Sequence, residues 1–416
     1  MFQQSHFTIL LLSLFVQAPS LFSISLDSIK SLGLPVITIE TVDGEEPTCE
    51  YVNPPEGMAG YGTRNATKVP GRLTITLGEK VLYDSGPYEK NVGGMRIKIR
   101  GNSSAWPRKK PYKVKLEVGA DLLLRGDEEK YANRDWLLLK DPELLQTIGF
   151  EASRLIGMEW TSGHRYVSLV MNGDYRGLYL LCEPVERNTR YRIDVSKTGY
   201  IVESDAYFWC EDLYIPSSLN PFGWTIKYPD ADDVTEEQVS FLSREMAQLE
   251  ESLVGPQYAE RIDVESFARW LLTHDILGTW DSYGSNLFIA RYDTLDSKVR
   301  MPVLWDFDTI FRMEGAWANI HRNASSSIIC LPAKTTRSGG HTFGCGTRYI
   351  RRFSRECYPS STDFRLRRRP RPSMRRCGWM QSGGTAVTPV WETIWTRQGP
   401  GSEAARHGWT KESPRR

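Results

Sequence analysis

The first half of the chain alternates apolar and polar residues, which is the pattern of half-buried β-strands. Alternating segments bounded by Gly, Pro and Asn occupy residues 36–40, 73–77, 95–100 and 112–117. Residues 166–171 and 177–182 flank the pair Asn172-Gly173, whose tolerance of positive φ angles favours a tight hairpin. The segments before residue 101 therefore predict a small sheet, and the Asn-Gly pair predicts a hairpin further along.

The later part of the chain changes to the 3.6-residue period of amphipathic helices. One apolar stripe runs from Leu144 to Gly157, and helical patterns also cover residues 235–253 and 263–279. Asp263 is a favourable N-cap for the last of these helices. Strands followed by helices predict an α+β fold in two lobes, with a β-rich N-terminal part and a helix-rich C-terminal part.

The formal net charge of +1 hides two unlike segments. Residues 321–416 hold 19 Lys and Arg against 5 Asp and Glu, a net charge of +14, and the remainder of the chain carries −13. The basic segment is rich in Arg and has no sustained apolar period, so it lacks the means to build a core. We interpret it as a disordered or frame-shifted tail. A nucleic-acid-binding arm is the alternative, and we expect no nucleic-acid partner because Cys, Trp and Gly interrupt the basic runs without pattern.

The N-terminus contains an apolar stretch, residues 7–16, that is long enough for the core of a signal peptide and too short to span a bilayer. It predicts a signal peptide over residues 1–25 and a secreted or extracytoplasmic protein. Because no Lys or Arg precedes this stretch, a buried N-terminal segment is the alternative. No other segment is apolar enough to predict a stable membrane span.

Four oxygen-bearing side chains form the strongest chemical pattern, namely Asp281, Asn286, Asp306 and Asp308. Transfer of a phosphoryl group to a hydroxyl needs a carboxylate near the acceptor and hard oxygen ligands that hold Mg²⁺ on the phosphates. In protein kinases the catalytic Asp precedes a metal-binding Asn by five positions, and a metal-binding Asp-Phe-Gly follows. Asp281 and Asn286 have this spacing, and Asp306 begins an Asp-Phe-Asp motif. Asp308 stands in place of Gly, where it either adds a metal oxygen or caps the turn. Each motif alone is also compatible with an ordinary turn.

A second pattern joins a polar turn to a basic strand. The turn is Arg100-Gly101-Asn102-Ser103-Ser104, and the strand carries Lys113 and Lys115 on one face because strand side chains alternate. Backbone N–H groups and hydroxyls of such a turn can bind phosphate oxygens, and a lysine can neutralise them. The alternative is a hairpin with a solvated basic strand.

At these residues the chain resembles the CotH (spore coat protein H-like) kinase family of atypical protein kinases. The resemblance covers roughly residues 95–312. It is carried by residues 99–104, residues 109–116, the Asn-Gly-Asp-Tyr-Arg-Gly-Leu-Tyr run at 172–179, Glu183, Asp281-Ser-Tyr, Asn286 and the Leu-Trp-Asp-Phe-Asp run at 304–308. It implies a two-lobed, atypical protein-kinase-like fold that binds ATP with Mg²⁺ or Mn²⁺ and phosphorylates Ser or Thr of secreted or cell-surface proteins.

The resemblance also implies a role for each candidate residue. Asp281 would orient or deprotonate the acceptor hydroxyl, and Asn286 and Asp306 would hold the metal, with Asp308 as a further candidate ligand. Either Lys113 or Lys115 would contact the phosphates beside the Arg100–Ser104 turn. Glu183 would pair with that lysine or face the adenine side.

Two departures limit the resemblance. The family often has an Arg-Asn pair where this chain has Gln146-Thr147, and the likeness ends near residues 320–325. We therefore divide the chain into the signal peptide, a small β-rich region (30–94), a kinase-like domain truncated at its C-terminal end (95–320) and the tail (321–416). Two other functions stay open. One is a non-catalytic surface or coat interaction protein that keeps the fold, and the other is a glycan-processing protein whose Asp281 and Asp306 flank a sugar.

Overall fold

The computed structural model describes residues 25–311, apart from residues 59, 142, 220–221, 231–232, 280–281, 283–284 and 296. All described residues belong to the first of two compact units into which the chain divides, Met1–Pro359. The predicted tail lies outside the described residues, as does the predicted signal peptide except for residue 25. Among the helices of the described part, none has both the length and the apolar character needed to cross a membrane.

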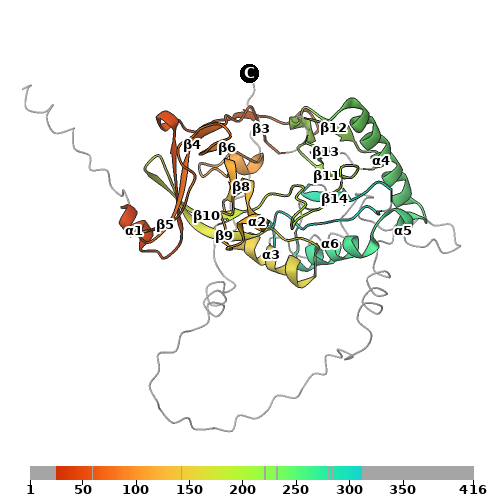
Figure 1. Cartoon of the computed structure of the whole chain (residues 1–416). Helices are drawn as coiled ribbons and strands as arrows, with labels where there is room; N and C mark the ends of the chain where they lie inside the picture. Colours follow the sequence, from red (N-terminus) through yellow and green to blue (C-terminus); the bar gives the residue numbers. More distant parts are fainter. Residues whose placement is uncertain are drawn as a thin grey trace, which may run out of the picture. The chain divides into compact units, whose positions relative to one another are not determined.

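Seven strands close on themselves into a barrel, which Figure 1 shows on its left side. The strands in spatial order are β1 (Val36–Thr41), β9 (His164–Met171), β10 (Asp174–Cys182), β8 (Asn133–Leu139), β7 (Tyr112–Ala120), β6 (Met95–Ile99) and β4 (Val69–Leu77). The antiparallel pairing of β4 with β1 closes the ring, and β1 pairs in parallel with β9. A further strand, β5 (Lys80–Asp84), extends the sheet from β4.

The alternating pattern of these strands places one set of side chains inside the barrel. The interior includes Ile39, Leu73, Ile97, Val114, Trp136, Leu169 and Tyr179. The other set faces outwards and contains both charged and apolar residues. In one cross-strand row Lys98 lies opposite Lys113, Lys113 opposite Leu137, and Leu137 opposite Cys182. The outer face of the barrel therefore changes from basic to apolar along that row.

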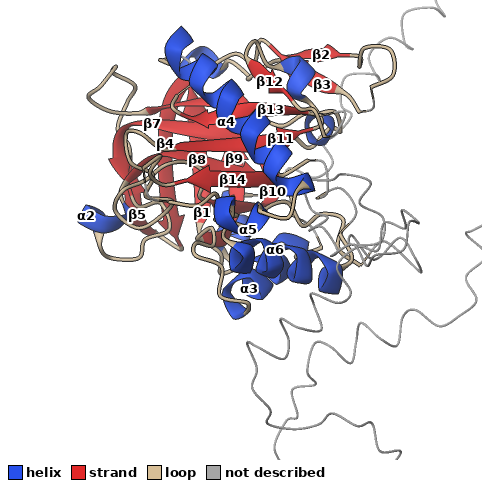
Figure 2. Cartoon of the chain, turned by 90° about the vertical axis from the view of Figure 1, so that its right-hand side faces the viewer, coloured by secondary structure: helices blue, strands red, loops and turns tan. Residues whose placement is uncertain are grey.

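A second, four-stranded sheet lies beside this outer face. Its strands in spatial order are β12 (Tyr214–Pro216), β13 (Gly223–Tyr228), β11 (Tyr200–Asp205) and β14 (Leu287–Arg291). The long helix α4 (Glu236–Val254) lies across β11 and β13, as Figure 2 shows. Trp224 Nε1 donates to Glu250 Oε1 of this helix at 2.8 Å. The second sheet is thus sandwiched between α4 and the barrel.

Two helices, α3 (Leu145–Leu155) and α6 (Val264–Leu277), lie side by side below both sheets in Figure 1. One large apolar core joins the outer face of the barrel, the second sheet and these helices, and it includes Leu139, Phe150, Leu180, Trp270 and Phe307. The remaining elements are short: α1 (Leu26–Lys30), α2 (Glu128–Tyr131), α5 (Tyr258–Arg261), β2 (Glu50–Val52), β3 (Gly62–Arg64) and 3-10 turns at Val42–Gly44, Ser103–Ala105 and Phe208–Cys210.

The predicted fold class was wrong. The structure is β-rich, with a closed barrel in its N-terminal part, and its C-terminal part is built on a second sheet rather than being helix-rich. Three of the six helices in the described residues have five residues or fewer. The pattern missed β11 because all its residues are buried, and a strand covered on both faces does not alternate in polarity. The three long helices and the hairpin at Asn172-Gly173 are confirmed.

Candidate active site

Two of the predicted metal ligands, Asn286 and Asp306, lie on two segments that run antiparallel beside each other. Ala290 of β14 and Arg300 exchange both backbone hydrogen bonds at 2.8 and 2.9 Å, which makes the two segments antiparallel. Asn286 precedes the bridge on one segment, and Asp306 follows it on the other. Because the segments are antiparallel, both residues lie beyond the same end of the bridge. Both have positive φ angles, 59° and 61°, in the region where Asn and Asp are enriched among non-glycine residues.

Gln146, in the first turn of α3, holds Asp306 from two sides. Its Nε2 donates to Asp306 Oδ1 at 3.1 Å, and its Oε1 accepts from the backbone N–H of Phe307 at 3.3 Å. Gln146 is 5% exposed, and Asp306 is half-buried. Within the described residues, no hydrogen bond occupies the second oxygen of Asp306. Among the described residues, Asp306 therefore presents one fixed carboxylate oxygen and one without a hydrogen bond.

The start of α3 also carries a second acid. Asp141 accepts from the backbone N–H groups of Leu145 and Gln146 at 2.9 and 3.2 Å, and from the hydroxyl of Tyr166 at 2.7 Å. Burial and this hydrogen bond raise the pKa of Tyr166. The positive end of the helix dipole favours both carboxylates near this terminus. Asp141 thereby orients the helix turn that holds Asp306.

Phe307 anchors the Asp306 segment in the core. It is fully buried, and a Cβ on Gly149 of α3 would overlap its ring. The Phe150 ring meets it edge-on, with centroids 5.6 Å apart, and His274 of α6 stacks on it at 5.9 Å. The backbone at Asp306 is therefore held by a ring packed between two helices.

The C-terminal end of α6 lies against the same segment. The backbone N–H of Phe311 donates to Leu277 O at 2.9 Å, and His274 Nδ1 is 2.6 Å from Thr279 Oγ1. The predicted catalytic residue, Asp281, comes two positions after Thr279 and lies outside the described residues. The described residues thus bring the chain leading to Asp281 next to the segment that carries Asp306.

Three lysines influence one another near the end of β8, and the sequence analysis gave none of them a role in the site. Lys140 follows β8, and burial lowers its pKa, with Lys110 adding to the effect and Asp308 opposing it. Burial and Lys140 also lower the pKa of Lys109, whose ammonium donates to Leu178 O and lies 4.5 Å from the Tyr179 ring centroid. Asp308 itself is exposed. Lys109 and Lys110 belong to the 109–116 run that carries the family resemblance, whereas Lys140 precedes only an Asp-Pro pair, which is common in turns.

The structure distinguishes the two lysines that the alternating strand could not. Lys113 Nζ forms an ion pair with Asp135 Oδ1 at 2.7 Å, and both side chains are largely shielded from solvent. Lys115 is exposed. Burial raises the pKa of the neighbouring Glu186 to about 7, Arg192 lowers it and Asp135 adds to the rise. Lys113 is therefore the lysine held within the layer between the barrel and the second sheet.

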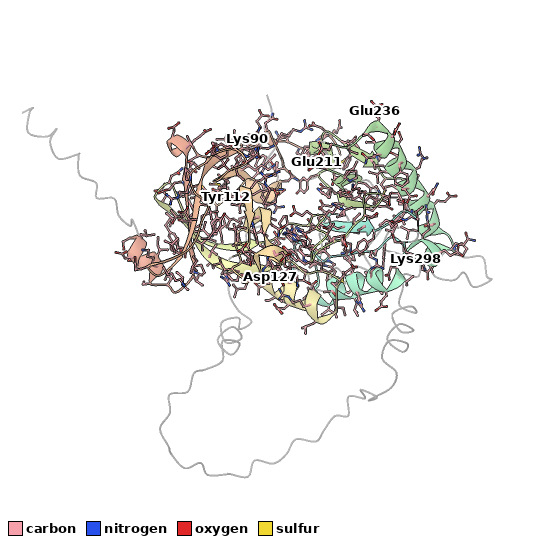
Figure 3. The ribbon with its side chains drawn as sticks, viewed as in Figure 1. Lys90, Tyr112, Asp127, Glu211, Glu236 and Lys298 are labelled. Carbon is pink, nitrogen blue, oxygen red and sulfur yellow. The ribbon has the colours of Figure 1, made fainter. Side chains whose placement is uncertain are left out.

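Acidic residues of the second sheet face this basic strand pair. Burial raises the pKa of Glu203 from its ordinary 4.5 to about 7, against the effect of Lys227, whose Nζ is 2.8 Å from Glu203 Oε2. Burial lowers the pKa of Lys98 on the barrel, and Glu211 partly opposes that shift. Figure 3 shows side chains between the two sheets, with Tyr112 labelled on the barrel and Glu211 on the second-sheet side.

The predicted phosphate-binding turn uses its polar groups inside the protein. The Asn102 amide oxygen accepts from Thr63 N at 3.2 Å, and the Gly101 carbonyl accepts from the Thr63 hydroxyl at 2.7 Å. The Ser103 hydroxyl accepts from Tyr61 N at 3.2 Å and lies 2.6 Å from the Tyr207 hydroxyl. The turn thus fastens the hairpin β2–β3 to the barrel and to the loop that follows β11 of the second sheet.

The other residues predicted for the nucleotide site, Arg100, Ser104, Lys113 and Glu183, take no part in the hydrogen bonds just described. Arg100 follows β6, and its charge lowers the pKa of Glu203. Ser104 lies in the 3-10 turn. Its Oγ packs so close to Gly101 that a side chain at position 101 would collide with it. Glu183 is 1% exposed and pairs with Arg125 at 2.8 Å, and it also accepts from Gly163 N. Lys113 pairs with Asp135, and not with Glu183 as one prediction had it.

The donor atoms around Asp306 fit a hard divalent cation. The described residues contain no group of three His, Cys, Asp or Glu side chains that could hold a metal. The carboxylate oxygen of Asp306 that stays unoccupied and the amide oxygen of Asn286 are nevertheless the ligand type that Mg²⁺ takes, and Mg²⁺ is commonly bound by one or two carboxylates with phosphates and water completing its shell.

The family comparison decides what kind of domain this is. The model of the family described as CotH kinase protein matches residues 97–336, which is more than half of the chain. The chain belongs to the CotH kinase protein family. The resemblance in the sequence is thereby confirmed, and the family name indicates a kinase-like function. Among curated proteins, no match to the chain was found.

The CotH match contains all the candidate residues and only part of the barrel. Strands β7 to β10 lie within it, the match begins inside β6, and β1 and β4 precede it. Because β1 pairs with both β4 and β9, residues before the match close the barrel around the CotH strands. The match also extends beyond residue 320, into the region predicted to be a tail.

Proposed function

We propose that this CotH domain is a phosphotransferase that moves the γ-phosphoryl group of ATP, in the presence of Mg²⁺ or Mn²⁺, to Ser or Thr of a secreted or cell-surface protein. The observation that carries the proposal is the fixed geometry of Asp306. Gln146 and the buried Phe307 hold its backbone and one oxygen, and the other oxygen stays unoccupied within the described residues. Such preorganisation favours electrostatic stabilisation of a charged transition state.

Asp306 and Asn286 would hold the metal ion in the proposed reaction. When bound, the ion would neutralise charge on the phosphates. Gln146 keeps Asp306 from rotating, and the N-terminus of α3 favours the ionised carboxylate. Lys140 and Lys113 would contact phosphate oxygens. Five positions of β8 separate Asp135, the partner of Lys113, from Lys140, a span of about 16 Å along the strand. The flexible four-carbon side chain of Lys140 can cover part of that distance, so that both ammonium groups can reach one triphosphate.

The acceptor hydroxyl would be oriented by Asp281. In the proposed reaction the hydroxyl oxygen attacks the γ-phosphorus, its proton passes to the Asp281 carboxylate, and ADP leaves with the electrons of the broken P–O bond. Thr279 places the chain leading to Asp281 beside Phe307 through His274. Export through the residues 1–25 signal peptide is part of the proposal, and sequencing the N-terminus of the secreted protein would test it.

A non-catalytic interaction protein is the second candidate. It is favoured by one observation, the engagement of Asp306 Oδ1 by the Gln146 amide, which removes one of the two oxygens from metal binding. In that case, nucleotide would have no effect on the melting temperature. A protein that binds ATP and metal instead rises in melting temperature with their concentration.

The direct test is transfer of labelled γ-phosphate from ATP, with Mg²⁺ or Mn²⁺, to a mixture of secreted proteins. We expect the wild-type chain to label Ser or Thr, identified by mass spectrometry, and Asp306→Asn to lose at least a hundredfold in rate. The substitution keeps the oxygen that accepts from Gln146, so the fold should persist. Asp174→Asn, in the exposed hairpin turn, is the matched control and should keep wild-type activity. Absence of transfer by the folded wild-type protein, or equal rates with Asp306→Asn, would overturn the proposal.

A further inference from the structure

A histidine that no motif selected lies between the two segments of the candidate active site. His274, in the last turn of α6, is fully buried. Its Nδ1 is 2.6 Å from the Thr279 hydroxyl, and its ring stacks on Phe307 with centroids 5.9 Å apart and planes inclined by 25°. One side chain therefore touches the residue after Asp306 and a residue two positions before Asp281.

The stability of the core does not explain this histidine. The Nε2 atom is buried and has no hydrogen-bond partner within the described residues. Burial lowers the pKa of His274 to about 3, so the ring is neutral at physiological pH. A buried polar atom without a partner destabilises a fold, and an apolar ring of similar size would avoid that loss. The polar contact with Thr279 is what the histidine adds over such a ring.

The backbone of the same residue holds the same turn. Gly278 N and Thr279 N donate to His274 O at 2.8 and 3.2 Å, and Gly278 has the left-handed conformation that ends many helices. Thr279 is fully buried. The carbonyl and the ring of His274 thus fix both the path of the chain out of α6 and the side chain of Thr279.

We propose that His274 is a positioning residue of the phosphotransfer site, which sets the segment leading to Asp281 against the Asp306-Phe307 segment. The inference rests on the proposed function. Reaction rates respond steeply to such alignment, because a displacement of about 1 Å can cost about a hundredfold. The bond to Thr279 acts on the segment leading to Asp281, which would orient the acceptor hydroxyl and not hold ATP, so loss of that bond lowers kcat and leaves the KM for ATP unchanged.

Two variants distinguish the hydrogen bond of His274 to Thr279 from the space that its ring fills. His274→Phe keeps a ring against Phe307 and removes the bond to Thr279, and Thr279→Val removes the same bond from the other side. We expect each to lower kcat about tenfold with the KM for ATP within twofold of wild type. The double variant should lose no more than either single variant, because both remove one interaction. His274→Asn, whose amide can replace Nδ1, should recover at least threefold in kcat over His274→Phe.

Trp270→Phe is the control for a purely structural role, because the Trp270 ring packs on His274 at 4.4 Å without contacting Thr279 through a hydrogen bond. It should lower the melting temperature and keep kcat per folded molecule. If the wild-type protein transfers no phosphate, the proposed function and this inference both fail. If it does, the inference alone fails when His274→Phe keeps its kcat, when the two losses add, or when Trp270→Phe lowers kcat equally.

Discussion

Two polar segments, Asp306–Asp308 and Arg100–Ser104, were predicted to line one site, and the structure uses their hydrogen-bonding groups differently. Buried Phe307 and Gln146 hold the first segment from behind, and an Asp306 oxygen stays unoccupied within the described residues. The second segment directs its amide, carbonyl and hydroxyl groups to Thr63, Tyr61 and other residues of the protein itself. Motifs of similar polarity can therefore leave an oxygen available in one place and serve fold closure in another.

Under the proposed function, this difference assigns the phosphate contacts to lysines and not to the turn. Lys113 is held by Asp135 in the layer between the sheets, and Lys140 lies near Asp308. Neither lysine belongs to the Arg100–Ser104 turn. The comparison between the two segments can be sharpened by variants that affect each one separately.

The largest effect is expected at the paired lysine. Lys113→Met removes a charge that the proposed reaction needs, and we expect kcat/KM for ATP to fall about a hundredfold. Lys115→Met changes the exposed lysine of the same strand face and should stay within twofold of wild type. The measurement is steady-state phosphate transfer at varied ATP. A larger loss at Lys115 than at Lys113 would reverse the assignment.

The anchoring of the Asp306 segment predicts the next effect. Gly149→Ala places a Cβ in the space of the Phe307 ring and should lower the free energy of unfolding by about 2 kcal/mol, together with a loss of activity. Gly255→Ala is the control, since the nearest atom to a Cβ there is 3.6 Å away. Denaturant unfolding measures both variants. An unchanged midpoint for Gly149→Ala would show that Phe307 is not confined.

A smaller effect concerns the acids that face the barrel. The pKa of Glu203 is raised from 4.5 to about 7, so the folded state holds a proton that the unfolded state releases in this range. Its contribution to stability is present below about pH 4.5 and is lost as pH rises through about 7. We measure the free energy of unfolding at pH values between these two limits. Glu203→Gln should make its decrease with rising pH smaller by about 1.5 kcal/mol. Glu56→Gln, at an exposed position, should leave the dependence of stability on pH unchanged. If Glu203→Gln kept the pH dependence of the wild type, the raised pKa of Glu203 would be refuted.

The smallest effect is expected in the Arg100–Ser104 turn. Ser103→Ala removes the link to Tyr61 and Tyr207 and should lower the free energy of unfolding by about 1 kcal/mol. Activity per folded molecule should stay within twofold of wild type. Should kcat/KM for ATP fall tenfold or more, Ser103 would contact phosphate, as the sequence pattern predicted.

Local periodicity accounts for the elements that the sequence predicted correctly. The sequence pattern identified six of the seven barrel strands, all except β8, together with the hairpin, and the apolar stripes identified α3, α4 and α6. The closure of the barrel depends on β1 pairing with β4 and with the distant β9, and no local pattern encodes such pairing. The sequence also indicates the strand over residues 287–292, which is β14, but β11 beside it escaped prediction because it is buried on both faces and shows no alternation.

The candidate site was predictable to the extent that its chemistry lies in short motifs. Asp306 was selected from its motif, but its partner Gln146 is 160 residues away in the chain and only the fold brings them together. Alternation placed Lys113 and Lys115 on one face, and it could not tell which of them Asp135 holds. The contact of His274 with Thr279 and Phe307 likewise depends on the packing of α6 against the Asp306 segment.

The binding of ATP measured by calorimetry with and without metal tests the central claim most directly, because it examines Asp306 before any acceptor protein is known. We predict that the wild-type chain binds ATP with Mg²⁺ or Mn²⁺, that a chelator weakens this binding, and that Asp306→Asn weakens metal-dependent binding at least tenfold. Equal affinities of the wild-type protein and Asp306→Asn, or binding that is indifferent to metal, would contradict the account.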